Sequence, residues 1–474
     1  MLFSASEWTV RKFGKVTYEQ IVFHLNVPIA SEIKLIYSFL QNTVMIASII
    51  TVIAYFISKR INLRKFLAAS SVLFVAFICF SWHMLDISNL INEYKNHTVM
   101  GQFYETHYVD PNSIKITSPK NKRNLIMIFA ESMESTYANP AYFGDNLIPE
   151  LTKIAQNENN VHFSDSENLG RFKNMMGAHY TQASMISQLC AIPLRLPIKT
   201  RRFHPTHGFL PGAVCLSDIL DKDGYNQSFM LGMTRFFSGT DAYLKTHGDV
   251  KILDWDFYSK RDHLSKDSDK KRKRIIRDNK LFEYAREEIK DLASKDKPFA
   301  FTIMTLDTHF GHEHFDNKKC TIKYHNDNVD DEENVRNVYS CSDKQIAEFV
   351  EWIKARPFYK DTEIVIVGDH YTMGPIQFGS DWNRSVYDVY INPVIKDKTY
   401  TRHRRFTALD TLPTLLESMG YSLEGHKFGL GVSLFSGKET LLEEIGDIEI
   451  LNEQLNQQSE IYNKMLYGSQ SIKK

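Results

Sequence analysis

Two long apolar runs near the N-terminus dominate the hydrophobic pattern of the chain. They cover residues 35–57 and 66–85, and neither contains Asp, Glu, Lys or Arg. Each has about the 20 residues that a helix needs to cross the hydrocarbon core of a bilayer. Neither run begins at the extreme N-terminus, so neither resembles a cleaved signal peptide. The pattern favours two transmembrane helices over the alternative, a pair of helices buried in a soluble core.

The short connector between the two runs predicts their orientation. Its sequence, SKRINLRK, carries Lys59, Arg60, Arg64 and Lys65. A short, densely basic loop stays on the cytoplasmic side of a membrane, so both flanking segments are expected to lie outside the cytoplasm. Residues 1–34 mix aromatic, apolar and charged positions, which is typical of an amphipathic segment on a membrane surface.

The pattern changes again after the second run. Residues 86–122 have mixed polarity and include Pro111 and Pro119, and we expect a stalk there. From residue 124 onwards, short apolar runs that end in polar residues alternate with helical patterns, as in residues 281–293 and 342–355. This alternation predicts a mostly parallel sheet with helices on both faces. The runs that we interpret as strands are NLIMIFAES (124–132), PFAFTIMTLDTH (298–309) and TEIVIVGDH (362–370). We expect a catalytic domain over residues 123–436 and a C-terminal tail over residues 437–474.

Charge and cysteine content narrow the function classes. Lys plus Arg and Asp plus Glu each number 57, so no basic excess points to nucleic acid as a partner. Four of the five cysteines lie outside the apolar runs as two close pairs, and no C-x-x-C motif suggests a zinc ribbon. The spacing is compatible with two disulfides in an oxidising compartment or with four unrelated buried thiols. The candidate pairs are Cys190–Cys215 and Cys320–Cys341.

Polar side chains follow three of the expected strands. Glu131 follows the first strand, His309 the second, and Asp369 and His370 the third. Ligands of open α/β sheets bind at the carboxyl ends of the strands, so these side chains are candidates for one site. Two carboxylates and two imidazoles suit Mn²⁺ or Zn²⁺ better than Ca²⁺. Individually, each residue could equally be a helix cap or a structural histidine.

A candidate nucleophile precedes a helical pattern in GAHYTQASMISQLCAIPL (177–194). Thr181 would begin this helix, where the positive end of the helix dipole favours an alkoxide. Coordination to a divalent cation would lower its pKa further. Composition alone also allows Thr181 to be a simple N-cap.

Five ordered motifs resemble one branch of the alkaline phosphatase superfamily, the sulfatase-like enzymes that include lipoteichoic acid synthase and the phosphoglycerol transferase of osmoregulated periplasmic glucans. The latter is the more similar, and residues 7–28 also resemble its membrane-proximal part. The resemblance extends from near residue 7 to about residue 440, although the family usually carries more membrane helices than two. It implies an α/β alkaline-phosphatase-like fold. The motifs are NLIMIFAESMEST, GAHYTQASMISQLCAIPL, CLSDILDKDGY, TLDTHFGH and EIVIVGDHYTMG.

The resemblance implies a role for each candidate residue. Thr181 matches the nucleophile and also a metal ligand, His309 matches the histidine that contacts the transferred phosphate, and Arg235 is similar to a headgroup-binding residue. The matched metal ligands are Glu131, Thr181, Asp369 and His370. One divalent metal is implied, Mn²⁺ first, with Zn²⁺ or Mg²⁺ as alternatives.

The implied reaction moves glycerophosphate from phosphatidylglycerol, through a phosphothreonine-type intermediate, to a hydroxyl of a glycan or polymer. The implied location is a bacterial inner membrane, with the catalytic domain in the periplasm. A phosphoethanolamine transferase and a catalytically inactive ectodomain are the alternatives. A sulfatase is disfavoured, because CAIPLR (Cys190 to Arg195) departs from C-x-P-x-R and Thr181 occupies the nucleophile position.

Overall fold

The computed structural model describes most of the chain and divides it into two compact units. The first unit is mainly Met1–Val99, and the second contains nearly all of Met100–Lys474. The described residues are 2–13, 18, 21–22, 37, 39–170, 172–195, 208–236, 239–262, 274–309, 313–324, 331–373 and 382–468.

The first unit is helical and contains two helices that are long and apolar enough to cross a membrane. They span Leu40–Ser58 and Leu63–Met84, with mean hydropathies of 1.8 and 1.9. The two predicted apolar helices are therefore present as candidate membrane spans. The second begins earlier than expected, because Arg64 and Lys65 form part of its first turn. The helices of this unit are α1 (Leu2–Phe13), η1 (Leu40–Met45), α4 (Ile46–Ser58), α5 (Leu63–Met84) and α6 (Ile87–Thr98).

A seven-stranded sheet forms the centre of the second unit, with the strand order β3-β8-β7-β2-β6-β4-β5. The five strands from β7 to β5 in this order are parallel, whereas β8 runs antiparallel to both β7 and β3. The three expected strands are confirmed as β2, β6 and β7. The bounds are β2 (Asn124–Ala130), β3 (Asn160–Val161), β4 (Asn226–Leu231), β5 (Val250–Leu253), β6 (Phe299–Met304), β7 (Thr362–Gly368) and β8 (Asp388–Ile391).

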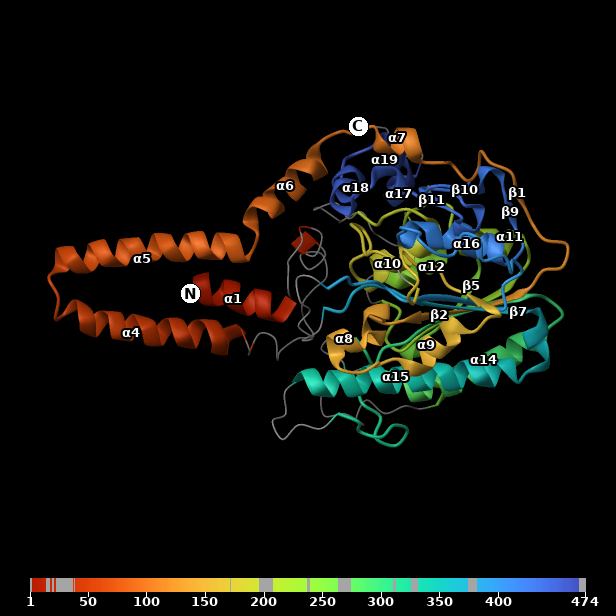
Figure 1. Cartoon of the computed structure of the whole chain (residues 1–474), viewed down its shortest axis with the longest axis horizontal. Coiled ribbons are helices and arrows are strands. Elements are labelled where there is room, and N and C mark those ends of the chain that lie inside the picture. The colour runs from red at the N-terminus through yellow and green to blue at the C-terminus, as the bar shows by residue number, and fades with distance from the viewer. Residues whose placement is uncertain are drawn as a thin grey trace. The chain divides into compact units, whose positions relative to one another are not determined.

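Helices cover both faces of this sheet (Figure 1). One face carries α9 (Pro149–Gln156), α14 (Asp278–Ala293) and α15 (Asp331–Lys354), and apolar residues of these helices share one buried core with Ile126 and Ile128 of β2. Alternate residues of β2 point to the other face, as the period of a strand requires. That face carries α10 (Thr181–Cys190), α11 (Leu216–Lys222), α12 (Thr240–Thr246) and α16 (Thr411–Ser418). The mixed α/β fold agrees with the sequence prediction.

Short elements fill the connections of the second unit. Two small antiparallel pairs, β1 with β9 and β10 with β11, lie outside the main sheet. The short helices are η2 (Ser135–Ala138), α8 (Pro140–Phe143), α13 (Trp255–Arg261), η4 (Pro357–Asp361), η5 (Ala408–Asp410), η6 (Glu424–His426) and η7 (Leu434–Ser436). The short strands are β1 (Ile116–Thr117), β9 (Ser422–Leu423), β10 (Lys427–Phe428) and β11 (Gly431–Val432).

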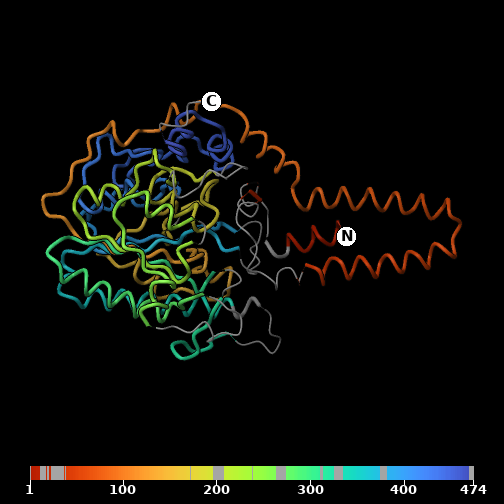
Figure 2. The backbone as a smooth tube through the Cα atoms, turned by 180° about the vertical axis from the view of Figure 1, so that it is seen from behind, coloured from red at the N-terminus to blue at the C-terminus, as the bar shows by residue number. Residues whose placement is uncertain are grey.

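The C-terminal residues pack against the segment that begins the second unit. Tyr104 in α7 (Phe103–His107) donates a hydrogen bond of 2.7 Å to the carbonyl of Leu455, and both residues are fully buried. Seen from behind, the blue C-terminal helices lie beside the orange residues that follow Met100 (Figure 2). The end of the expected stalk and the expected tail therefore belong to the same unit as the sheet. The C-terminal helices are α17 (Leu441–Ile445), α18 (Ile448–Leu455) and α19 (Glu460–Tyr467).

Two disulfides lie in the second unit. Cys190–Cys215 joins the last residue of α10 to the residue before α11, with an S–S distance of 2.02 Å. Cys320–Cys341 joins a connecting segment to α15. These are the two pairs that the sequence spacing suggested.

Candidate active site

The neighbouring strands β2 and β7 end side by side and bring two acidic residues together. Ala130 and Gly368 are paired in the parallel register, so Glu131 and Asp369 follow at adjacent positions on the same sheet edge. Gly368 is required here, because a Cβ atom at this position would lie 2.0 Å from the carbonyl oxygen of Met133. The chain can therefore turn across the end of β7 only where no side chain is present.

Thr181 faces this pair from the N-terminus of α10. Its hydroxyl donates a hydrogen bond of 3.3 Å to Glu131 Oε2 and lies 3.2 Å from His370 Nε2. The N-cap position belongs to Tyr180, and no side-chain capping bond is present. Thr181 is thus the first helical residue, and its side chain points to acidic and imidazole groups rather than to the backbone of its own helix.

We refer to Glu131, Thr181, Asp369 and His370 as the Thr181 cluster. All four side chains are buried, with exposed fractions between 0% and 8%. His370 Nε2 lies 3.3 Å from Asp369 Oδ2 and 3.6 Å from Glu131 Oε1. The structure therefore brings the four predicted residues together. Because they are buried, any net charge on them costs free energy unless an opposite charge compensates it.

The cluster fits a divalent cation. Glu131, Asp369 and His370 each offer one ligand atom, and these atoms all lie within 4.8 Å of one another. Asp369 Oδ2 is buried and accepts no hydrogen bond in the described part of the chain. Burial and the neighbouring carboxylate of Asp369 raise the pKa of Glu131, which reflects a deficit of positive charge. Oxygen and nitrogen donors of this kind suit Mn²⁺, Zn²⁺ or Mg²⁺.

Hydrogen bonds around the cluster orient these donor atoms. Asp369 Oδ1 accepts bonds from the backbone N–H groups of Ser132 (2.6 Å) and His370 (2.9 Å), which leaves Oδ2 for a cation. His370 Nδ1 lies 2.8 Å from the carbonyl of Tyr371, and donation to this acceptor leaves the lone pair of Nε2 facing the cluster. Such outer contacts set the tautomer and direction of a metal-binding histidine.

An ion pair between the buried Glu134 and the partly exposed Arg384 holds the backbone that follows His370. Arg384 donates to both carboxylate oxygens of Glu134, and Glu134 Oε1 also accepts a 3.0 Å bond from the backbone N–H of Thr372. Arg384 further donates to the carbonyl of Thr372 at 3.1 Å. The sequence analysis missed this pair. Glu134 could have been noticed beside Glu131, but nothing in the sequence connects it with Arg384, 250 residues away.

The segment after β6 borders the cluster and ends at His309. Thr305 Oγ1 accepts a 2.9 Å bond from the Glu131 N–H, and Thr308 Oγ1 donates a 2.6 Å bond to the Glu131 carbonyl. His309 is adjacent to Thr308 and lies at the carboxyl edge of β6, the strand beside β2. His309 therefore lies on the same sheet edge as Glu131 and Asp369.

Arg235 follows β4, the next strand along the same sheet edge. Its guanidinium forms two hydrogen bonds to the buried Asp254, at 3.1 and 2.7 Å. In the described part of the chain its bonds go to Asp254 and Asp241 rather than to the Thr181 cluster. The same loop region reaches α10 through Thr240, which donates a 2.8 Å bond to Gln182, the neighbour of Thr181. Arg235 is therefore on the expected edge, with its side chain held by an acidic partner.

Comparison with known proteins places these residues in a family. A model described as Sulfatase matches residues 123–421, which is more than half of the chain. The chain belongs to the sulfatase family. All four residues of the Thr181 cluster lie inside the matched range, and so do His309 and Arg235.

Curated relatives of this sulfatase-family chain include phosphoglycerol transferases. Phosphoglycerol transferase I of Shigella flexneri is 29% identical over 354 residues, which are 71% of this chain and 41% of that protein. Phosphoglycerol transferase I of Escherichia coli strain 55989 is 31% identical over 286 residues, 57% of this chain and 33% of that protein. The chain spans less than half the length of these relatives.

Two solved structures share the sulfatase-family fold of the chain. The lipoteichoic acid synthase LtaP of Listeria monocytogenes has a TM-score of 0.52 and 16% identity, over 68% of this chain and 79% of that one. The lipooligosaccharide phosphoethanolamine transferase A of Neisseria meningitidis, an integral membrane protein, has a TM-score of 0.51 and 12% identity, over 88% and 82%. At these identities the similarity establishes the fold alone.

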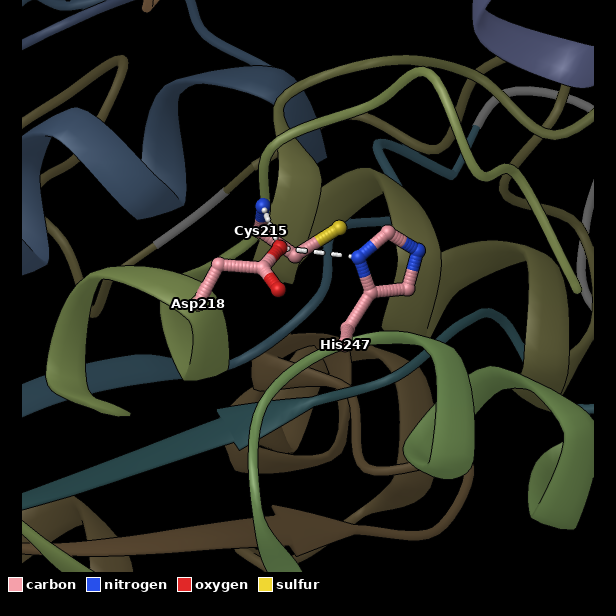
Figure 3. A group of neighbouring side chains, drawn as sticks. All are labelled: Cys215, Asp218 and His247. Carbon is pink, nitrogen blue, oxygen red and sulfur yellow. Dashed lines mark hydrogen bonds and ion pairs between the residues drawn. The ribbon is translucent and has the colours of Figure 1, made fainter. Parts of the chain in front are cut away.

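A second group in the sulfatase domain has the composition of a metal site but not its chemistry. Asp218 accepts 2.8 Å bonds from the Cys215 N–H and from His247 Nδ1 (Figure 3). His247 Nε2 lies 2.9 Å from the carbonyl of Phe209, and the sulfur of Cys215 is bonded to Cys190. No ligand atom of Cys215 or His247 is left for a cation. The hydrogen bonds among Cys215, Asp218 and His247 therefore stabilise the start of α11 next to the disulfide.

Proposed function

We propose that this protein is a membrane-anchored phosphotransferase that moves glycerophosphate from phosphatidylglycerol to a hydroxyl of an extracytoplasmic glycan or polymer. Residues 123–436 would form the catalytic domain, which the family match over residues 123–421 supports. Residues 35–85 would anchor it in a bacterial inner membrane, with residues 1–34 at the membrane surface and residues 86–122 as a connecting stalk. Residues 437–474 would complete the packing of the catalytic domain.

The observation that carries the proposal is the position of the Thr181 hydroxyl. It begins α10 and lies 3.3 Å from Glu131 Oε2 and 3.2 Å from His370 Nε2. Buried acceptors can take its proton, and the helix dipole favours the resulting oxyanion. These are the features of an activated nucleophile.

The reaction then has two balanced steps. Thr181 Oγ1 attacks the phosphorus of phosphatidylglycerol, and the phosphorus–oxygen bond to diacylglycerol breaks. Diacylglycerol leaves with a proton, and the glycerophosphoryl group stays on Thr181 as a diester. A hydroxyl of the acceptor next attacks the same phosphorus, gives up its proton, and returns Thr181 to its hydroxyl form. Two steps let a bulky lipid leave before a bulky acceptor enters.

The residues around Thr181 have separate tasks. Glu131, Asp369 and His370 would hold one divalent cation, which when bound lowers the pKa of the Thr181 hydroxyl and offsets phosphoryl charge. We propose Mn²⁺, with Zn²⁺ or Mg²⁺ as alternatives. His309 would contact the transferred phosphoryl group. Arg235 would border the headgroup while Asp254 holds its side chain.

Two observations argue against sulfatase chemistry in this branch of the family. A sulfatase of this family needs a cysteine or serine in a C-x-P-x-R motif, which is converted to formylglycine, and the similar segment here begins at Cys190. Cys190 is bonded to Cys215 at the C-terminal end of α10, so its sulfur cannot undergo that conversion. Thr181, at the other end of the helix, is left as the nucleophile.

Intact-mass analysis tests the proposed function. The detergent-solubilised chain would be incubated with Mn²⁺ and phosphatidylglycerol, beside Thr181→Ala and Thr181→Ser. We expect a one-glycerophosphate adduct on the native protein, a weaker one on the serine variant, none on the alanine variant, and released diacylglycerol. An adduct only with phosphatidylethanolamine would reassign the donor. An unmodified protein with either lipid would leave the inactive-ectodomain alternative.

A further inference from the structure

A polar cavity of about 130 Å³ lies at the β3 edge of the sheet, and none of its lining residues belongs to the Thr181 cluster. Its walls come from the end of α9, from β3, from the segment 167–169 and from the segment 398–402. The side chains that matter for its chemistry are Asn157, Asn160, His162, Lys398, Thr401 and Arg402.

Two cations line this cavity without acidic partners. Within the described ranges, neither Lys398 nor Arg402 has a carboxylate oxygen within 4.0 Å. Lys398 Nζ donates instead to the carbonyl of Glu158 at 2.6 Å, and Arg402 donates to the carbonyl of His162 at 2.9 Å. The carboxylate among the lining residues, Glu167, pairs with the exposed His403 at 2.8 Å. Neither cation is therefore paired directly, and negative charge acts on them only from beyond this distance: Glu158 acts to raise the pKa of Lys398, and Arg402 acts to lower the pKa of Asp388.

His162 fixes the direction of Arg402 and adds no negative charge. Its side chain is 4% exposed, and its Nε2 accepts a 3.0 Å bond from Arg402, so the imidazole is neutral with its proton on Nδ1. Burial and the charges of Arg402 and Lys398 lower the pKa of His162 to about 3. Burial and Arg402 also lower the pKa of Lys398. Both shifts have the direction expected for basic groups that are partly desolvated and lie near another positive charge.

The size and the donors of the cavity define the ligand class. A volume of about 130 Å³ holds a few water molecules, which is also the size range of a tetrahedral oxyanion. Arg402 offers a planar fork of N–H donors and Lys398 a point charge, the two groups that proteins use for phosphate. The side-chain amide of Asn157 supplies a neutral donor. The Asn160 amide already donates to the carbonyl of Ile154 at 2.8 Å, and the Thr401 hydroxyl donates to the carbonyl of Lys398 at 2.9 Å.

We propose that this cavity, which we call the edge cavity, binds a phosphate group through Lys398 and Arg402, separately from the site of the proposed transfer reaction. The group could come from inorganic phosphate or from a small phosphate monoester, and the two sources share this chemistry. The inference does not depend on the identity of the donor lipid.

Calorimetric titration of the detergent-solubilised chain with inorganic phosphate tests the edge cavity. One titration would follow EDTA treatment, because the metal-free Thr181 cluster is acidic and repels phosphate. We expect one binding event in the native protein, weakened about tenfold in Lys398→Gln and lost in Lys398→Gln/Arg402→Gln. Lys360→Gln is the matched control, because Lys360 is 81% exposed and its ion-pair contact, to Asp361, is 3.8 Å long. Glycerol 3-phosphate and sulfate would be titrated in parallel to identify the source.

The outcomes separate the edge cavity from the proposed function. Lys398→Gln should form the glycerophosphate adduct at the native rate, because Lys398 lies outside the Thr181 cluster. Equal phosphate binding in the native protein, Lys398→Gln and the double variant would overturn the proposal, as would the absence of any binding after EDTA. Arg402→Gln loses its bonds to His162, so thermal unfolding without phosphate checks that the variants carrying it remain folded. If they unfold, the single variant Lys398→Gln still tests the proposal, because it keeps Arg402 and its bonds.

Discussion

The two carboxylate oxygens of Asp369 differ in their hydrogen bonding. This difference predicts the effect of the Asp369→Asn substitution. Oδ1 accepts two backbone bonds, whereas Oδ2 is buried and accepts none. Asp369→Asn keeps one acceptor and replaces the other oxygen with an N–H group that cannot bind a cation. We expect metal affinity to fall more than 100-fold and adduct formation to stop, while the metal-free protein stays folded because a buried charge has been removed.

Metal analysis and thermal unfolding would check this expectation for Asp369. Asp388→Asn is the matched control, because Asp388 is also buried and also has one carboxylate oxygen without a hydrogen bond. It lies in β8, outside the Thr181 cluster. Loss of metal from both variants, or from neither, would contradict the assignment of Asp369 as a ligand.

A buried carboxylate in β7 predicts how stability changes with pH. Burial raises the pKa of Glu363 to about 8, whereas the unfolded chain has the usual value of about 4.3. The folded state therefore binds more protons between these values, and the free energy of unfolding contributed by Glu363 falls as the pH rises from about 4 to about 8. Glu363→Gln removes this dependence, so its Tm should exceed that of the native protein at pH 8 and approach it at pH 5. Glu351→Gln, at an exposed position of α15, should leave the pH profile unchanged.

At the scale of elements, the Glu134–Arg384 ion pair connects the turn after β2 with the segment after β7. It fixes the N–H and the carbonyl of Thr372, two residues beyond His370. We expect Arg384→Gln to lower the rate of adduct formation 10- to 100-fold with a smaller change in KM, because the imidazole is no longer held in place. Arg384→Lys should rescue little, since one ammonium cannot reproduce the two parallel bonds.

A second ion pair supplies the control for Arg384. Arg404 contacts Glu443 at 2.8 Å and also binds the carbonyl groups of Leu434 and Lys438. Arg404→Gln should lower the Tm without changing the rate per folded molecule. If both variants lower the rate equally once folding is accounted for, the Glu134–Arg384 pair is merely structural.

The elements differ in how well the sequence predicted them. β2, β6 and β7 are short apolar runs with polar ends, so their local pattern specified both the strands and the edge where Glu131 and Asp369 meet. Thr181 could not be distinguished from an N-cap by pattern, since that choice depends on a partner from β2. Residues 437–474 were expected only as a tail, because their sequence is acidic and then rich in Gln and Asn. Their packing depends on Tyr104, which is 351 residues away from its partner Leu455.

At the scale of the whole molecule, the two units favour different surroundings: an apolar solvent for the first unit and an oxidising compartment for the second. The apolar side chains of the two long helices in the first unit are largely exposed, as expected where lipid is the solvent. The second unit contains two disulfides, which persist in oxidising compartments. A lipid donor and an extracytoplasmic acceptor are both compatible with this combination. The orientation of the membrane helices decides whether the second unit reaches such a compartment.

The basic residues between the membrane helices allow that orientation to be tested. Lys59 and Arg60 precede α5, and Arg64 and Lys65 lie in its first turn. We expect this positive charge to hold the loop on the cytoplasmic side of the membrane, so replacing all four residues with Gln should make a fraction of the chains insert the opposite way. In those chains the second unit would face a reducing compartment, and Cys190 and Cys215 would carry free thiols. Thiol labelling before and after reduction measures that fraction. The control Lys120→Gln/Lys122→Gln, which removes charge from the second unit instead of the loop between the apolar helices, should leave all four of these cysteines oxidised. Fully oxidised cysteines in the quadruple variant would mean that another part of the chain sets the orientation.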